Sequence, residues 1–220
     1  RGGYGCIRIL DKINFDIIKN NPKLFIGYSD ITSLHVAINE LAGLATIHGP
    51  MLTTSIADNF DNITKHSFVN IIAGKTKDLS NLHGEKIKIL RYGETTGQII
   101  GGSLSLVVAS LGTKYEINTK QRLFFLEDIN EYTYKIDKMF NQLKLAGKFD
   151  DCNGVILGDF NNCNKEKSED FSLLDVFKNI FTNFEKPVIY NFKSGHCHPM
   201  ISIPFGIKCE LKALEEKTSV

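Results

Sequence analysis

The stretch from Lys23 to Thr32, KLFIGYSDIT, constrains the fold of this chain more than any other. A short apolar run ends at Gly27, Ser29 follows two residues later, and Asp30 opens an amphipathic segment. This pattern predicts a strand, a sharp turn and a helix, with the serine hydroxyl at the turn. Such an elbow exposes the serine Oγ and directs free backbone N–H groups of the helix at whatever the serine attacks. The alternative is that Ser29 is an ordinary helix N-cap.

The composition narrows the class of protein. The 220 residues hold 26 Lys and Arg against 25 Asp and Glu, a net charge of +1, which indicates neither nucleic acid nor an anionic membrane as a partner. No apolar run approaches the roughly 18 residues of a membrane-spanning helix. The five cysteines are scattered, odd in number and without a Cys-x-x-Cys motif. They indicate reduced thiols and a cytoplasmic location.

Strands alternate with helices along the chain, which predicts an α/β fold. A polar, aperiodic stretch over 75–86 is the expected boundary between a domain of residues 1–78 and a domain of residues 79–220. Gly101-Gly102 matches no dinucleotide or P-loop spacing, so close backbone packing explains it better than a phosphate site. Strands are expected at 23–28, 45–48, 87–92, 98–100, 122–126, 154–160 and 187–192, with a strand pair in 201–211, and helices at 30–41, 60–73, 134–146 and 171–184.

A serine hydroxyl is a poor nucleophile unless a base, usually His, lies within hydrogen-bond reach and an acid orients that base. The chain offers such groups in the order Ser, Glu, His. Glu127 closes an apolar strand and is expected to project from the strand end into a loop region; Asp128 and Glu131 are alternative acids on the residues alone. His196 directly follows another predicted strand. Strand ends are where α/β folds place catalytic groups.

Six stretches, in order along the chain, resemble the LD-carboxypeptidase family of serine peptidases, which includes muramoyltetrapeptide carboxypeptidases and microcin C immunity peptidases. Each stretch is short, but together they cover nearly the whole chain. They are RGGYG at 1–5, FIGYSDIT at 25–32, HGPM at 48–51, GQIIGGSL at 97–104, FLEDI at 125–129 with YKIDKM at 134–139, and GH at 195–196 ahead of IPFG at 203–206.

The resemblance implies a nucleophile at Ser29, an orienting acid at Glu127 and a general base at His196. It also implies an oxyanion hole made by the backbone N–H groups of Gly3 and Asp30. The implied fold is a flavodoxin-like N-terminal domain that carries the nucleophile, followed by a β-rich swivelling domain that carries Glu and His. The implied activity is release of a C-terminal D-amino acid, typically D-Ala, from murein tetrapeptide in cell-wall recycling, without a cofactor.

Three other functions stay open. One is hydrolysis of peptidyl- or aminoacyl-nucleotide amides, as in microcin immunity. Another is peptide binding without turnover, because the glycine-rich start at residues 1–5 predicts that an N-terminal portion is missing. The third is a generic esterase. The expected partner is a small peptide, with no nucleic acid and no membrane; the resemblance also implies a homodimer, for which the residues show no interface signature.

The remaining histidines have plainer interpretations. His196 and His198 lack a third ligand nearby, so no metal site is expected. His35 lies on the apolar stripe of a predicted helix and is expected to be a core residue. His48 follows a strand, and either lines the cleft or serves a turn.

Overall fold

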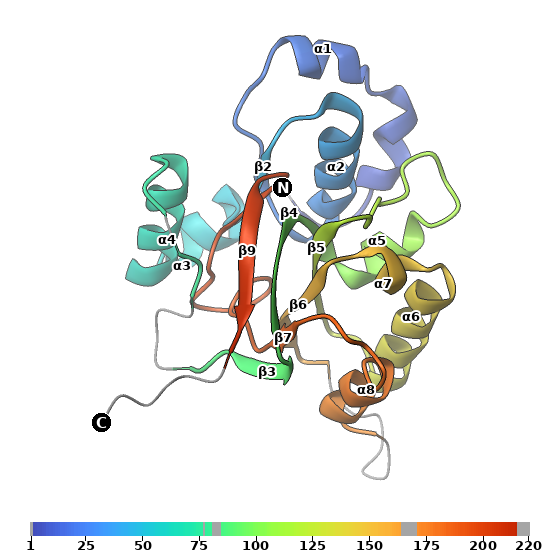
Figure 1. Ribbon diagram of the computed structural model, residues 1–220. Helices are drawn as coiled ribbons and strands as arrows, with labels where there is room; N and C mark the ends of the chain where they lie inside the picture. Colours follow the sequence, from blue (N-terminus) through green and yellow to red (C-terminus); the bar gives the residue numbers. More distant parts are fainter. Residues whose placement is uncertain (1, 77, 81–84, 164–170, 215–220) are drawn as a thin grey trace.

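The computed structural model describes residues 2–76, 78–80, 85–163 and 171–214. Its strands form two sheets, and the expected α/β class is confirmed (Figure 1). The smaller sheet has the order β1-β2-β8, from β1 (Ile26–Gly27), β2 (Thr46–His48) and β8 (Ile203–Phe205). The larger sheet has the order β3-β7-β6-β5-β4-β9, from β3 (Lys88–Arg91), β4 (Gly93–Ser103), β5 (Arg122–Ile129), β6 (Gly154–Asn161), β7 (Val188–Tyr190) and β9 (Lys208–Ala213).

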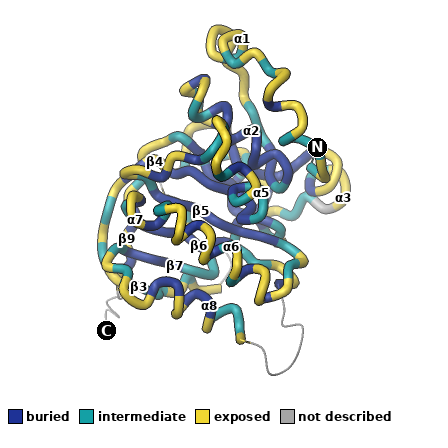
Figure 2. Tube along the Cα trace, turned by 90° about the vertical axis from the view of Figure 1, so that its right-hand side faces the viewer, coloured by how far each residue is buried: buried dark blue, intermediate teal, exposed yellow. Residues whose placement is uncertain are grey.

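Parallel pairing joins the central strands β4, β5, β6 and β7 of the larger sheet, while β3 and β9 pair antiparallel at its two edges. Side chains alternate between the faces of a strand, so β5 contributes to two apolar clusters. Phe124 and Leu126 pack on the side of α6 (Thr133–Leu145) and α8 (Leu173–Ile180). Leu123 and Phe125 pack on the opposite side, with strand β8. Figure 2 shows β5 as buried over most of its length.

Short helices surround the sheets (Figure 1). In this view α6 and α8 lie to the right of the larger sheet, α3 and α4 to its left, and α1 and α2 above it. The other helices are η1 (Cys6–Lys12), α1 (Phe15–Asn20), η2 (Ser29–Ile31), α2 (Thr32–Ala37), η3 (Ile38–Ala42), η4 (Leu52–Ile56), α3 (Ala57–Asn59), α4 (Asn62–Ile72), α5 (Leu104–Ala109) and α7 (Lys148–Asp151). None of the helices in the described ranges is long and apolar enough to span a membrane.

The single helix expected over 30–41 is wrong in detail. The chain instead forms a 3₁₀ turn, a short α-helix and a π turn in succession, which are η2, α2 and η3. Ser29 has φ of +64°, so the first turn closes early, with the Ile31 N–H donating to the Tyr28 carbonyl at 3.3 Å. The helices η1 and α1, before the elbow, were not expected from the sequence.

The strand pair expected over 201–211 is also different. Strand β8 joins the smaller sheet beside β2, whereas β9 joins the larger sheet beside β4. Gly206, at φ +82°, lies between them. The proposed division of the chain at 78 and 79 stays a prediction, and residues 77 and 81–84 of that boundary lie outside the described residues.

Gly101 allows β4 and β5 to lie unusually close together. Gly101 pairs with Phe125 across the two strands and has φ of +138°. A Cβ at this position would overlap the Phe125 carbonyl oxygen. The close-packing interpretation of the Gly101-Gly102 pair is therefore confirmed.

Replacing Gly101 with Ala is expected to lower the free energy of unfolding by about 4 kcal/mol or more, because backbone overlap adds to an unfavourable φ. Gly43→Ala is the matched control. Gly43 has φ of +66°, but a Cβ there would meet nothing within 4 Å, so a loss of about 1 kcal/mol is expected. Urea unfolding followed by circular dichroism measures both, and equal losses would contradict the close approach.

Candidate active site

Ser29 lies at the predicted sharp turn between β1 and η2. Its φ of +64° is uncommon for a residue with a side chain. Gly27 fits because a Cβ there would come within 3.0 Å of the Ile31 side chain, so the strand and the turn pack closely. The positions that cap η2 and α2 are Tyr28 and Ile31, and neither forms a side-chain capping bond. The N-cap alternative for Ser29 is therefore not supported.

The glycine-rich segment lies against this turn. A Cβ on Gly2 would be 3.5 Å from the Ser29 Cβ. The Gly2 N–H donates to Met51 Sδ at 2.8 Å, and the Cys6 N–H donates to Asp30 Oδ2 at 2.9 Å. The structure thus brings the segment that contains Gly3 next to both Ser29 and Asp30.

Glu127 and His196 meet although they are 69 residues apart. His196 Nδ1 lies 2.8 Å from Glu127 Oε2, and because a carboxylate only accepts, Nδ1 carries the proton. Glu127 is 0% exposed. Gly195 leaves room for this pair, since a Cβ there would be 2.5 Å from Glu127 Oε2. Asn161 Nδ2 donates to the His196 carbonyl at 2.7 Å and holds the loop from the end of β6.

Glu127 does not project from a strand end as expected. Strand β5 continues to Ile129 and its pairing with β6 shifts register between Leu126 and Asp128, so the acid lies within the strand and is fully buried. The neighbouring acids have other partners. Asp128 accepts the Ser105 and Ile129 amides, both at 2.8 Å, and Glu131 pairs with Lys135 at 3.2 Å. Among the three candidate acids, Glu127 is the one that contacts His196.

Burial and charge oppose each other in this pair. Burial lowers the pKa of His196, but the hydrogen bond and charge of Glu127 outweigh it and raise the pKa above its ordinary 6.5. Burial raises the pKa of Glu127, and the His196 hydrogen bond acts in the other direction. His196 is therefore a stronger base than a free imidazole.

Two contacts join the Ser29 turn to His196 and to β4, the strand that pairs with the Glu127 strand. The rings of Tyr28 and His196 meet edge to face with centroids 4.9 Å apart. Thr32 Oγ1 accepts the Ser103 N–H at 3.0 Å, and Ser103 pairs with Glu127 between β4 and β5. Thr32 was not expected from the sequence as a site residue, although it lies in the stretch from Lys23 to Thr32 that predicts the turn.

The other two buried histidines lie behind the turn. His35 is a core residue, as expected, and its Nε2 lies 2.8 Å from the Gly27 carbonyl, so it supports the strand before Ser29. Burial lowers its pKa to about 4. His48 is fully buried among aromatic rings. Its ring centroid lies 5.1 Å from that of Phe125, and the residue thus lines no open cleft. Burial also lowers the pKa of His48, so both imidazoles are neutral.

In the described residues, no three His, Cys, Asp or Glu side chains gather in a group that could hold a metal ion. All five cysteines are unpaired.

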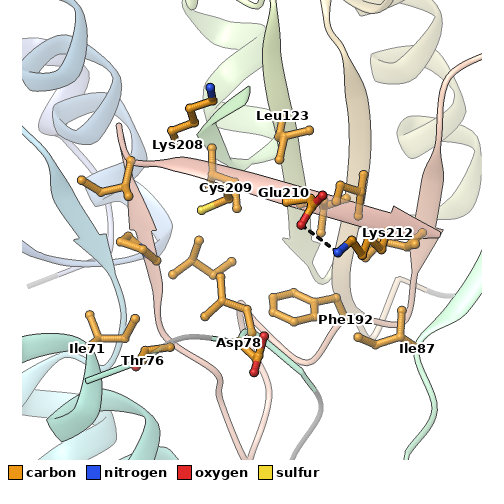
Figure 3. Close-up of a pocket in the computed structure, with 18 of the residues that line it drawn as sticks. Ile71, Thr76, Asp78, Ile87, Leu123, Phe192, Lys208, Cys209, Glu210 and Lys212 are labelled. Carbon is orange, nitrogen blue, oxygen red and sulfur yellow. Dashed lines mark ion pairs between the residues drawn. The ribbon is translucent and has the colours of Figure 1, made fainter. Parts of the chain in front are cut away.

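A hollow of about 620 Å³ lies on the face of the larger sheet opposite α6 and α8 (Figure 3). Ile87 and Phe192 line it, and Glu210 pairs there with Lys212 at 2.9 Å. Its lining includes none of Ser29, Glu127 and His196, so it is separate from the candidate active site.

The buried pair makes a prediction about titration. In Glu127→Gln, the raising effect of the carboxylate is lost while burial remains, so the His196 midpoint is expected to fall from above 6.5 to below it. NMR titration of the imidazole Cε1–H signals measures this. His35 is the internal reference, because its midpoint near 4 depends on burial and not on Glu127. An unchanged His196 midpoint would show that the carboxylate does not control this imidazole.

Comparison with known proteins identifies relatives of this chain. The model of the LD-carboxypeptidase N-terminal domain matches residues 1–49, and that of the C-terminal domain matches residues 96–211. The chain is 42% identical to a probable murein peptide carboxypeptidase of Bacillus subtilis (strain 168), over 100% of this chain and 69% of that protein. It is 29% identical to the microcin C7 self-immunity protein MccF of Escherichia coli, over 94% of this chain and 68% of that protein.

A solved structure shares the fold. The muramoyltetrapeptide carboxypeptidase from Oxalobacter formigenes superposes with a TM-score of 0.83 at 23% identity, over 98% of this chain and 74% of that one. With matches to both of its domain models and a relative of 42% identity along its whole length, this chain belongs to the LD-carboxypeptidase family of hydrolases.

Proposed function

We propose that this protein is a serine-type LD-carboxypeptidase that releases D-Ala from the C-terminus of murein tetrapeptide during cell-wall recycling in the cytoplasm. The observation that carries the proposal is the buried Glu127–His196 pair, whose imidazole contacts Tyr28, the residue before Ser29. The 42% identity to a probable murein peptide carboxypeptidase supports the substrate class.

In the proposed first step, Ser29 Oγ attacks the carbonyl carbon of the peptide bond before D-Ala. His196 Nε2 takes the hydroxyl proton, because Nδ1 is committed to Glu127. The carbonyl oxygen becomes an oxyanion, and the backbone N–H groups of Gly3 and Asp30 bind it. Glu127 fixes the tautomer of His196 and stabilises its charged form.

In the second step the carbon–nitrogen bond breaks, and His196 gives its proton to the D-Ala amine. Water then attacks the acyl carbon while His196 accepts a proton from it. The bond between that carbon and Ser29 Oγ breaks, His196 returns the proton to Oγ, and the peptide leaves with a free carboxylate. These steps call for no cofactor. The partner is a small peptide, and the proposal includes neither nucleic acid nor membrane; a homodimer is the proposed assembly.

The second candidate is hydrolysis of an aminoacyl- or peptidyl-nucleotide amide. The 29% identity to the microcin C7 self-immunity protein, over 94% of the chain, favours it. The same three side chains would cleave that amide, so only substrate turnover separates the two functions. A third reading, peptide binding without turnover, predicts that a serine-directed probe leaves Ser29 unlabelled.

Ser29→Ala is expected to lower the rate of D-Ala release by several orders of magnitude, because no other group replaces the attacking oxygen. Mass spectrometry of murein tetrapeptide incubated with the protein measures the loss of one D-Ala. Ser172→Ala is the matched control. Ser172 caps α8 by accepting the Asp175 amide at 3.1 Å, so its loss is expected to cost about 1 kcal/mol of stability and leave the activity intact.

Retained activity in Ser29→Ala would exclude this residue as the nucleophile. Turnover of an aminoacyl sulfamoyl adenylate, with none of the tetrapeptide, would move the assignment to the nucleotide substrate. Equal hydrolysis of small esters without preference for a D-configured leaving group would indicate a generic esterase.

A further inference from the structure

Asp30 carries a buried carboxylate at the residue after the proposed nucleophile. The residue is 4% exposed, and its Oδ2 accepts the Cys6 N–H at 2.9 Å. Cys6 lies 24 residues earlier and is the first residue of η1. Burial and then the neighbouring Asp30 carboxylate raise the pKa of the Cys6 thiol to about 12. A buried carboxylate is costly unless it is hydrogen-bonded, and the Cys6 amide supplies such a bond.

This contact holds one end of the glycine loop, residues 2–5. The other end is held where the Gly2 N–H donates to Met51 Sδ at 2.8 Å. Between the two ends, Gly3 has φ of +113°, and a Cβ there would meet nothing within 4 Å. Its three glycines have no side chains that could pack, and Tyr4 is 84% exposed, so the position of this loop beside Ser29 depends on the contacts at its ends.

We propose that Asp30 is a positioning residue, whose carboxylate anchors the glycine loop by accepting the Cys6 N–H. This anchor sets the Gly3 N–H at the oxyanion position beside Ser29. The inference rests on the proposed function, in which the amides of Gly3 and Asp30 bind the oxyanion. Asp30 then serves both donors, one with its own amide and the other through its side chain.

Electrostatics indicates that an acid at position 30 has a role beyond packing. A negative charge close to a developing oxyanion opposes it, so a residue needed only for packing would be better neutral. A charged acceptor, however, forms a stronger hydrogen bond than a neutral one. Such a bond is useful where a flexible loop must be held, because a donor misplaced by about 1 Å can cost on the order of 10²-fold in rate.

Substitutions of Asp30 test the anchor. Asp30→Leu removes the acceptor and is expected to lower kcat for tetrapeptide by about 10²-fold, with a much smaller change in KM, because the loop donor acts on the transition state. Asp30→Asn keeps an acceptor oxygen and is expected to stay within about 10-fold of the wild type. Asp175→Leu is the control. Asp175 also bonds a backbone amide, that of Ser172 at 3.0 Å, but at α8, and its loss is expected to leave kcat unchanged.

Substitutions of Cys6 test the other partner. Cys6→Pro removes the donated N–H at the first position of η1. It is expected to reproduce the loss of Asp30→Leu, and the double variant is expected to lose no more than either alone. Cys6→Ala removes only the thiol and is expected to behave like the wild type.

Amide hydrogen exchange of residues 2–8 gives a readout that does not need turnover. Faster exchange in Asp30→Leu and Cys6→Pro, but not in Cys6→Ala or Asp175→Leu, supports the anchor. Unchanged exchange with unchanged kcat overturns it, as does an additive loss in the double variant. If Asp30→Leu does not fold, the comparison of Cys6→Pro with Cys6→Ala decides.

A failure of the proposed function is recognised separately. If the wild type leaves the tetrapeptide intact, that substrate is wrong, and the rate at which a fluorophosphonate labels Ser29 becomes the readout. Slower labelling by about 10²-fold in Asp30→Leu and Cys6→Pro then supports the anchor, because the probe also needs an oxyanion hole. Labelling at the wild-type rate overturns it.

Discussion

The burial of the Glu127 carboxylate within β5 is the constraint on which the site depends. A fully buried carboxylate is tolerated only when it is paired and hydrogen-bonded, and here the partner comes from a loop 69 residues later. That loop must approach closely, which Gly195 permits because it has no side chain. The same burial that makes the acid costly also keeps water from weakening its hold on His196, so the imidazole is oriented and made more basic by one contact.

The turn at Ser29 poses a different physical problem. A left-handed φ at a serine is unfavourable, and it persists only when the surroundings fix it. His35 meets the Gly27 carbonyl behind the turn, and Thr32 accepts the Ser103 amide in front of it. These bonds come from residues on both sides of the turn and connect it to β4. The conformation of Ser29 is therefore stabilised by the same contacts that place it near the Glu127 strand.

How far the sequence predicts this arrangement differs from residue to residue. The Ser29 turn follows from a local pattern, an apolar run, a glycine and an acid, and the structure has a turn there. The environment of Glu127 could not be predicted, because the register shift between β5 and β6 depends on strands far apart in the chain. Strand β8 has the pattern of a hairpin partner for β9, yet it pairs with β2, since two neighbouring segments can satisfy their hydrogen bonds in different sheets. The contact between Asp30 and Cys6 leaves no periodic signal at all, because it joins one side chain to one backbone amide.

The contacts around the site differ in kind from those in the core. Apolar packing such as that of Phe124 and Leu126 stabilises the sheet but is not directional, so it tolerates small shifts between elements. The contacts near Ser29 join a side chain to a backbone amide or carbonyl, as Asp30 does with Cys6 and Thr32 with Ser103, and such bonds weaken steeply when their geometry changes. Chemistry that needs a hydrogen-bond donor placed accurately against an oxyanion calls for such directional polar contacts. It follows that substitutions in the apolar clusters act first on stability, whereas loss of one of these polar contacts acts first on the geometry of the site.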